Sequence, residues 1–264
     1  MSIMKVGKTL VVTTVLGVLL AASYGCDQQK PKCSTGRGTF IAKYTVVSGP
    51  PECAALKGEK IGVQTYNPTD NSGKQTPDLD KATLAIQSES MGLLVETGEA
   101  AMVSDPDPAH KPYALGAFAT SEPSGDFCVA PTLSFAQVNL PAIKEDKAAM
   151  IDAQPKTEVI YEWANVKVYV TAAAYGTQFT ADLLISTNKV SCTYKVAAMY
   201  PYVDCSIPDP VDEKKTIADP SLCAAEANPD KGHATGSGIN PDFPVVCDAE
   251  LKACVLTKPI PALN

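Results

Sequence analysis

The chain has 264 residues, is 45% hydrophobic and 19% charged, and carries a formal net charge of -7 with a single arginine, Arg37. Nucleic-acid binding depends on neutralising phosphates and on forked guanidinium contacts, so an acidic chain with one arginine argues against a nucleic-acid partner. The same negative charge argues against adhesion to anionic lipid headgroups.

The first 25 residues have the order of an export signal. Lys5 and Lys8 precede an uncharged apolar run at residues 10–22, and small residues follow that run. A basic, then apolar, then small-residue order is typical of a secretory signal peptide, so residues 1–25 are interpreted as one and the protein as exported. The mature chain then has 20 basic and 29 acidic residues, a net charge of -9. A retained transmembrane anchor is an alternative, although the uncharged stretch is at the short limit of about 17 to 25 residues for a spanning helix.

The segment that ends at Cys26 resembles the lipobox of bacterial lipoproteins, in which a small residue precedes a cysteine that becomes acylated. Gly25 and Cys26 match this pattern, whereas Ser23 replaces the usual leucine and Tyr24 is larger than usual. The resemblance implies acyl chains, such as palmitate, on Cys26, and attachment to the bacterial cell envelope. We expect the lipid to anchor the protein to the outer membrane, on its periplasmic or surface face. Two or more chains provide stable anchoring, and ordinary cleavage that leaves Cys26 as a thiol is the alternative.

The next elements alternate between polar linkers and strands. Residues 26–38 are interpreted as a lipidated tether, because they are almost free of apolar side chains. Apolar and polar residues then alternate over residues 40–46, 60–66 and 82–87, which predicts three half-buried strands. The intervening residues 67–81 have the Asn, Asp, Gly and Pro content of a surface loop.

The middle of the chain is less regular. Residues 88–101 fit a strand, turn and strand, and residues 113–119 and 132–140 are predicted strands separated by a turn at residues 122–126. Residues 142–153 are the best helix candidate, because good helix formers there lie between two prolines.

The strongest pattern occupies residues 157–205. Apolar residues change from odd to even positions near Ala164, which predicts a bulge at Ala164–Asn165. Alternation on both sides of a turn at residues 187–189 predicts an antiparallel hairpin with one apolar face. Residues 39–205 are therefore predicted to form a mainly β domain, an antiparallel β-sandwich or open barrel with one short helix.

The last segment, residues 206–264, is a loop-rich tail. Its first part, up to residue 244, contains six prolines and seven acids, so it can bury little by itself and Cys223 is expected to be its main fixed point. Residues 244–257 are predicted to form a terminal hairpin. The C-terminal segment is thus expected to be rich in proline and aspartate and tied by disulfides.

Nine cysteines would leave one unpaired, but a lipidated Cys26 leaves eight, an even number suited to four disulfides in an exported protein. Proximity in the sequence favours Cys33 with Cys53 and Cys247 with Cys254. The other two bridges would then be shared by Cys128, Cys192, Cys205 and Cys223. The spacing of cysteines and histidines is unlike that of zinc sites, so no metal site is predicted.

The candidate polar sites are few. His110 and His233 are the only histidines, so any Ser-His or Cys-His mechanism must use one of them, but both lie in loop-like sequence and are interpreted as solvated. For His110 a weak site for a cation is the alternative. Residues 67–73 and 209–213 carry several oxygen ligands without the pattern of a calcium loop, and are interpreted as solvated loops.

Aromatic residues gather in the strongest β pattern, beside Glu162. On strands such residues belong more often to a core, but they could also line a sugar-binding or peptide-binding face. They are Tyr161, Trp163, Tyr169, Tyr175 and Tyr194.

Four segments together resemble uncharacterised cell-envelope lipoproteins of the myxobacterial type. They are residues 161–171 (YEWANVKVYVT), 176–183 (GTQFTADL), 202–205 (YVDC) and 240–248 (NPDFPVVCD). This resemblance covers about the last third of the chain and implies an envelope location. It implies no site residues, because that family has no assigned activity.

These patterns favour a non-enzymatic, lipid-anchored module of the cell envelope, used for binding, adhesion or assembly. Its expected partners are the membrane, reached through the N-terminal lipid, and an envelope protein or glycan, with no cofactor. One alternative is an envelope hydrolase that needs only two suitably placed carboxylates. Another is a structural component of a surface coat.

Overall fold

The computed structural model describes residues 31–264 except Asn71 and Glu213. The predicted signal peptide and the predicted lipidation site at Cys26 lie outside these residues. In the part of the chain that is described, no helix is both long and apolar enough to cross a membrane.

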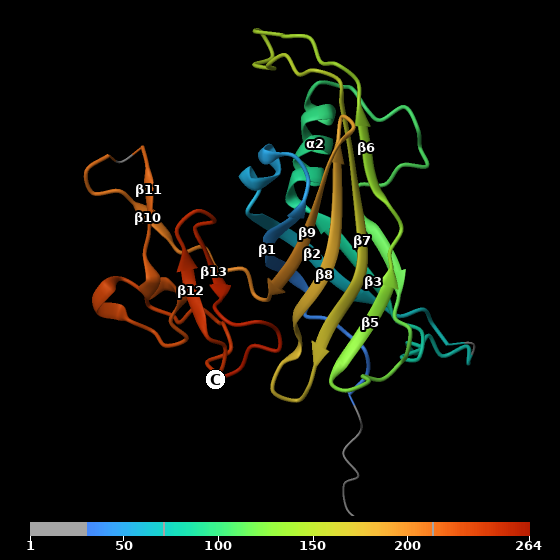
Figure 1. Cartoon of the computed structure of the whole chain (residues 1–264), viewed down its shortest axis with the longest axis vertical. Coiled ribbons are helices and arrows are strands. Elements are labelled where there is room, and N and C mark those ends of the chain that lie inside the picture. The colour runs from blue at the N-terminus through green and yellow to red at the C-terminus, as the bar shows by residue number, and fades with distance from the viewer. Residues whose placement is uncertain (1–30, 71, 213) are drawn as a thin grey trace, which may run out of the picture. The chain divides into compact units, whose positions relative to one another are not determined.

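One antiparallel sheet dominates the described residues, as expected for a mainly β protein (Figure 1). It contains β1 (Gly38–Ser48), β2 (Gly58–Tyr66), β3 (Thr83–Ser88), β4 (Ala114–Ala117), β5 (Phe127–Thr132), β6 (Ala136–Leu140), β7 (Thr157–Val170), β8 (Tyr175–Thr187) and β9 (Val190–Met199). The strand order is β4-β3-β2-β1-β9-β8-β7-β5, and β6 also pairs with β7.

The sheet curls into an open barrel, which agrees with one of the two predicted folds. Its outermost strands approach each other without forming a continuous ladder. The N–H of Ala119 donates to the carbonyl of Val129 at 2.8 Å, and the N–H of Ser134 donates to that of Leu115 at 2.7 Å. Inward-facing residues of the strands form one apolar core, in which Trp163, centrally placed on β7, is 2% exposed.

Two details of β7, β8 and β9 confirm the sequence prediction. The β7–β8 register shifts between Ala164 and Lys167, and Asn165 has a φ of 51°, so the expected bulge lies at this point. Asn188 and Lys189 both have positive φ between the paired residues Thr187 and Val190. This is the geometry of a two-residue hairpin turn that matches strand twist.

Helix α2 (Glu89–Ala100) replaces the strand, turn and strand expected at residues 88–101. The Oγ of Ser88 accepts a hydrogen bond from the N–H of Met91, which caps the first turn. Met91 is 1% exposed and belongs to the barrel core. Capping and burial at the end of the barrel therefore decide the structure of this segment. A short 3-10 helix, Pro51–Ala55, also connects β1 to β2.

The predicted helix at residues 142–153 is wrong. Isolated bridges pair Ile143 with Gln154 and Asp146 with Ile151, so the segment folds back as an extended loop. The carboxylate of Asp146 accepts hydrogen bonds from the N–H groups of Ala148 and Ala149, which stabilises the turn. Residues 144–150 are exposed, so a helix here would have no packed face to stabilise it.

Residues 31–37, which the sequence assigns to the tether, pack against the barrel. Thr35 is buried, and its N–H and hydroxyl lie 3.0 and 2.9 Å from the hydroxyl of Thr65. The N–H of Gly36 donates to the carbonyl of Gly176. These contacts join the N-terminal segment to β2 and β8.

The tail contains two small hairpins and two further 3-10 helices. Its elements are β10 (Ser206–Pro208), β11 (Thr216–Ala218), Pro220–Cys223, Pro229–Lys231, β12 (Val245–Asp248) and β13 (Ala253–Leu256). The β12–β13 pair confirms the predicted terminal hairpin. The tail packs on the outer face of the sheet, where the buried amide of Gln178 exchanges two 2.9 Å hydrogen bonds with the backbone of Ala262.

A polar cluster ties α2 to the barrel. The carboxylate of Glu59 on β2 accepts hydrogen bonds from the hydroxyls of Tyr44 and Tyr161 at 3.0 and 2.9 Å. It also accepts from the N–H and hydroxyl of Ser90, in the first turn of α2. Burial first, and then the Glu59 charge, raises the pKa of both tyrosines above the ordinary value.

This cluster predicts a loss of stability in alkali. An unfolded tyrosine ionises near pH 10, whereas Tyr44 and Tyr161 stay protonated in the folded chain, so their contribution is complete below pH 10 and is lost above it. We expect the free energy of unfolding to fall above pH 10 by about 1.4 kcal/mol per pH unit for each of the two tyrosines. Urea denaturation from pH 8 to 11 measures this slope. The slope should be shallower in Tyr44→Phe and unchanged in Tyr175→Phe, because Tyr175 is 46% exposed in the native chain. Equal slopes in the native chain and Tyr44→Phe would contradict this explanation.

Candidate functional site

A groove of about 810 Å³ crosses the outer face of β1, β2, β3 and β4. Sites for small molecules typically have volumes of about 300 to 1,000 Å³, so the groove is large enough for a ligand of several rings.

The register of the strands explains why this face is hollow. Gly62 lies between Thr39 and Gln87, and Ala85 lies between Gln64 and Leu115. Alternation turns these outward-facing positions away from the core, but glycine and alanine bring almost no side chain with them. The floor is therefore low, and the longer neighbouring side chains become its walls.

The walls combine aromatic rings with neutral hydrogen-bonding groups. Tyr66 is 51% exposed and Tyr113 is 36% exposed, so both rings are accessible. Among the described lining residues none is charged, although the chain as a whole is 19% charged. The polar side chains are Thr39, Gln64, Asn67, Thr83 and Gln87. Such a surface offers stacking faces and both donors and acceptors without a charge to select an ion.

A second hollow of about 390 Å³ continues from the groove toward α2, and shares Thr39, Gly62 and Gln87 with it. Two carboxylates, those of Glu89 and Glu96, lie there. Glu89 is ion-paired with Lys60 at 2.5 Å. The backbones of Glu89 and Glu96 are about 10 Å apart along the helix, because seven residues rise by 1.5 Å each.

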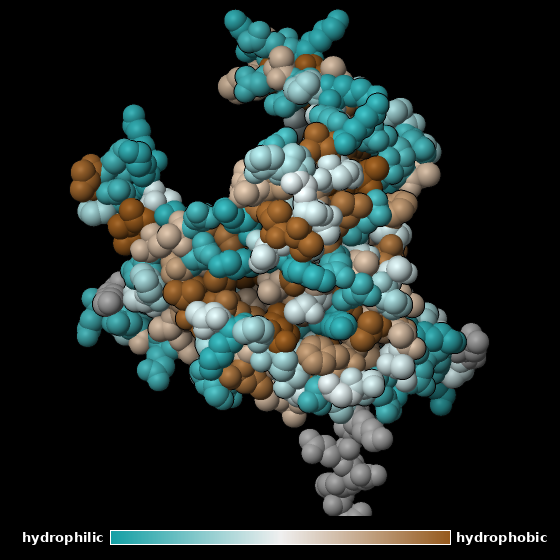
Figure 2. Space-filling model, viewed as in Figure 1, coloured by the Kyte–Doolittle hydropathy of each residue, from teal (hydrophilic) through white to brown (hydrophobic). Residues whose placement is uncertain are grey.

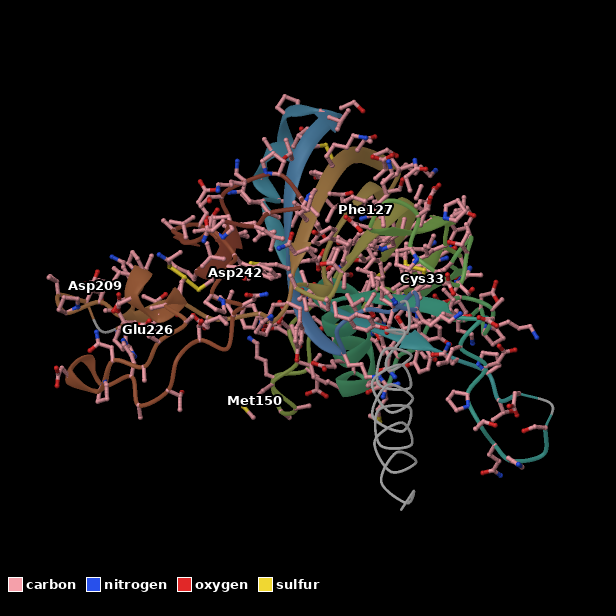
Figure 3. The ribbon with its side chains drawn as sticks, turned by 90° about the horizontal axis from the view of Figure 1, so that it is seen from below. Cys33, Phe127, Met150, Asp209, Glu226 and Asp242 are labelled. Carbon is pink, nitrogen blue, oxygen red and sulfur yellow. A yellow bond between two sulfur atoms is a disulfide. The ribbon has the colours of Figure 1, made fainter. Side chains whose placement is uncertain are left out.

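The eight cysteines of the described residues form four disulfides, but the two pairings favoured by proximity are wrong. The bonds are Cys33–Cys128, Cys53–Cys192, Cys205–Cys247 and Cys223–Cys254. Figure 3 labels Cys33, whose bond joins the N-terminal segment to β5.

Geometry explains both corrections. Cys33 and Cys53 lie beyond opposite ends of β1, an 11-residue strand that spans roughly 35 Å at about 3.4 Å per residue. Cys247 and Cys254 do face each other in the β12–β13 hairpin. Directly opposed strand positions, however, place Cβ atoms about 4.5–5.5 Å apart, which is generally wider than a disulfide prefers.

The sulfurs of Cys205, Cys223 and Cys247 lie within 4.8 Å of one another. This proximity arises because two disulfides pack side by side in the core of the tail. Oxidised sulfurs do not supply the thiolates that bind a metal, so the cluster is structural.

His110 is not the solvated side chain expected from the sequence, because its side chain is 19% exposed. Its Nδ1 lies 3.0 Å from an Asp105 oxygen and its Nε2 lies 3.5 Å from an Asp107 oxygen. Burial alone would raise the pKa of Asp105, but hydrogen bonds, first from the N–H of Asn139, hold it below its usual value. These contacts fasten the loop to β6.

His233 lies in the tail with its Nε2 3.5 Å from the hydroxyl of Ser221. That hydroxyl donates to the carboxylate of Asp219 at 2.6 Å. In a catalytic triad the acid orients the histidine and the histidine takes the serine proton. Here the serine hydroxyl donates its proton to Asp219 rather than to the histidine, which differs from the arrangement in a triad.

In each of the two oxygen-rich loops a described carboxylate accepts hydrogen bonds from its own loop. Asp70 accepts hydrogen bonds from the hydroxyls of Ser72 and Thr76, and Asp209 accepts one from the N–H of Val211. The hydrogen bonds that Asp70 accepts, first the one from Ser72, lower the pKa of its carboxyl group.

The aromatic residues singled out in the sequence do not form a common face. Tyr161, Trp163, Tyr169 and Tyr194 are each 7% exposed or less and belong to the two apolar cores, whereas Tyr175 is 46% exposed. The groove lies elsewhere, on strands whose positions the sequence predicted. Its signal in the sequence is the uncharged outward-facing series at residues 62, 64, 66, 83, 85 and 87.

Comparison with known proteins extends the resemblance beyond the last third of the chain. The MlpA family model matches residues 38–201, which include β1 to β9, α2 and the groove. A protein of Myxococcus xanthus named "Putative lipoprotein MlpA" is 28% identical over 249 residues, which cover 90% of this chain and 89% of that protein. No solved structure matches. The similarity to myxobacterial lipoproteins is thus confirmed over most of the chain.

Proposed function

Because the chain belongs to the MlpA family, we propose that it is a lipid-anchored protein of the bacterial outer membrane that binds a neutral saccharide without converting it. The Myxococcus relative is named as a lipoprotein, which supports membrane anchoring in the envelope. The single observation that carries the choice of ligand is the uncharged, aromatic-walled groove on β1 to β4.

The chemistry of the groove fits a sugar. A pyranose ring has an apolar face of C–H groups that can stack on a tyrosine, and its hydroxyls both donate and accept hydrogen bonds. Tyr66 and Tyr113 provide the stacking surfaces, and the amides of Gln64 and Gln87 provide matching donors and acceptors. A strongly charged ligand would lose its hydration without gaining an ion pair among these residues.

A peptide strand fits the groove less well. Extended peptides bind mainly by adding a strand to an exposed sheet edge. The floor strands β2 and β3 are paired on both sides, β2 with β1 and β3, and β3 with β2 and β4. Their backbone groups are therefore committed to the sheet, and recognition depends on side chains alone.

Binding is favoured over hydrolysis by the position of the acids. Glycoside hydrolases place two carboxyl groups about 5–9.5 Å apart across the scissile bond. Glu89 and Glu96 lie in the adjoining hollow rather than in the groove, and Lys60 holds Glu89 in an ion pair.

The ligand assignment is tested with the native, full-length protein in detergent micelles. Titration calorimetry is carried out with neutral oligosaccharides of glucose, mannose, galactose and N-acetylglucosamine, with a polyglucuronate and with an extended neutral peptide. We expect saturable binding of at least one neutral oligosaccharide and no comparable binding of the other two probes. Binding of the polyglucuronate or the peptide alone would reject the neutral saccharide.

Replacement of Cys26 by serine tests the anchor. A serine hydroxyl cannot take the place of the thiol that is acylated, so the variant is expected to leave the membrane fraction almost completely. Fractionation of cells followed by immunoblotting measures this change, and Lys147→Gln, at a side chain that is 85% exposed, is the control that leaves every disulfide intact. A Cys26→Ser protein that remains in the membrane fraction would exclude lipid anchoring at this residue.

A further inference from the structure

A third hollow, of about 570 Å³ and separate from the two described above, lies on the outer face of β1, β9, β8 and β7. The register places Lys43, Ala197, Thr180 and Lys167 in one row across these four strands. Adjacent strands are about 4.8 Å apart, so the two lysine backbones are about 14 Å apart. Between them lie only the small side chains of alanine and threonine, which form the floor.

The neighbouring rows complete the walls. In the row on one side, Lys195 of β9 lies between Thr45 of β1 and Asp182 of β8. On the other side, the row that contains Ile41 is buried under the tail, and Pro259 and Ile260 of the tail line the hollow. Figure 2 presents the face with β7, β8 and β9, where hydrophilic side chains lie among hydrophobic ones.

The hollow has more positive than negative charge. Lys43 is paired with Asp248 at 2.8 Å, and Lys195 is paired with Asp182. Among the described residues, no carboxylate lies within 4 Å of the Lys167 ammonium. The hydrogen bond from Lys195 comes first among the interactions that lower the pKa of Asp182, and the Lys167 charge contributes. Three ammonium groups thus face two carboxylates, a local excess of one positive charge in a chain of net charge -7.

We propose that this hollow binds a phosphate monoester or free phosphate. Lysine is a compact charge on a flexible stem, so Lys43 and Lys167 can lean over the floor from both sides toward one anion. The hydroxyls of Thr45 and Thr180 supply further donors for phosphate oxygens. The amide of Asn165 donates one N–H to Asp182 and has a second N–H to offer.

This site is independent of the saccharide groove. Along β1 the groove includes Thr39 and the hollow includes Lys43, and the buried Ile41 lies between them beneath the tail. A ligand in one site therefore need not occupy the other. The failure of either assignment leaves the other one standing.

Lys167→Gln tests the site in the native, full-length protein. Lys167 is exposed, and none of the described carboxylates forms an ion pair with it within 4 Å, so the variant should fold with an unchanged melting temperature. Calorimetric titration with inorganic phosphate is expected to show binding that weakens about tenfold in Lys167→Gln. Lys147→Gln, which removes an equally charged side chain that is 85% exposed on the loop at residues 142–153, should bind like the native protein.

Two further probes identify the source of the phosphate. Glucose 6-phosphate represents a soluble phosphorylated sugar, and neutral vesicles with added phosphatidic acid represent a phosphomonoester lipid. Binding of either probe that depends on Lys167 supports the site and identifies the source. The assignment is overturned if inorganic phosphate does not bind, or if it binds equally to Lys167→Gln and the native protein.

Discussion

Replacement of Cys53 and Cys192 by alanine is expected to lower the free energy of unfolding by about 5 kcal/mol. This bond joins residues 139 positions apart, and a cross-link restricts the unfolded chain more when the loop that it closes is longer. Domains are typically stable by about 5 to 15 kcal/mol, so the loss would remove a large part of the total. Guanidinium denaturation followed by circular dichroism measures the change.

The matched control removes Cys205 and Cys247, whose bond spans 42 positions. Its expected cost is about 4 kcal/mol by the same chain-entropy relation. A larger loss from the short tail bond than from the long barrel bond would contradict the explanation. Intact-mass analysis of the native protein provides the count of bonds, because reduction should add two hydrogens for each of the four disulfides.

Gly62→Phe is expected to weaken saccharide binding by at least about a hundredfold, because a ring on the floor occupies the space that the ligand needs. The folded chain can accept the substitution. Gly62 is exposed and has no positive φ, and a Cβ built there meets only the carbonyl of Gln87, at an ordinary 3.8 Å. The melting temperature should therefore be preserved while binding is lost.

Thr45→Phe is the control for this variant. It places the same ring at an exposed outward position of β1, outside the groove and in the lining of the hollow proposed to bind phosphate. Titration with the oligosaccharide that binds the native protein should give native affinity for Thr45→Phe and no measurable affinity for Gly62→Phe. If both variants bind the saccharide equally well, the groove is not its site.

Most strands of the barrel were predictable because each has one buried and one exposed face, and this produces the period of two in the sequence. Strand β5 was not predicted: it occupies Phe127–Thr132, where no strand was expected, and the strand expected at residues 132–140 begins only at Ala136. The bulge at Asn165 was predictable for the same reason, since a change from odd to even apolar positions requires an extra residue. The turn at Asn188 and Lys189 carried a recognisable polar signal between two alternating segments.

Helix α2 was not predictable from local preference. Gly92 and Gly98 weaken the helical signal. The apolar residues that pack on the barrel core, Met91, Leu94 and Val95, form a run so short that it also suits a strand. The interactions that stabilise it are the Ser88 cap and the burial of Met91 against the end of the barrel. Conversely, good helix formers at residues 142–153 had no surface to pack against, and a turn around Asp146 prevailed.

Disulfide pairing and the groove depend on which strands meet in space. Cys53 reaches Cys192 only because β1 pairs with β9, a long-range contact that sequence proximity cannot reveal. The hollow floor likewise requires Gly62 and Ala85 to lie on neighbouring strands of the same face. The outward positions were visible in the sequence, but their grouping follows from the register.

The groove is tested most directly by nuclear magnetic resonance titration of the isotope-labelled native protein with the oligosaccharide that binds it. The predicted result is that the amide signals of Gly62, Gln64, Ala85 and Gln87 shift together and saturate at one dissociation constant, while those of Thr180 and Lys195 remain in place. Shifts confined to the tail, or to the outer face of β7, β8 and β9, would contradict the assignment of the groove as the saccharide site.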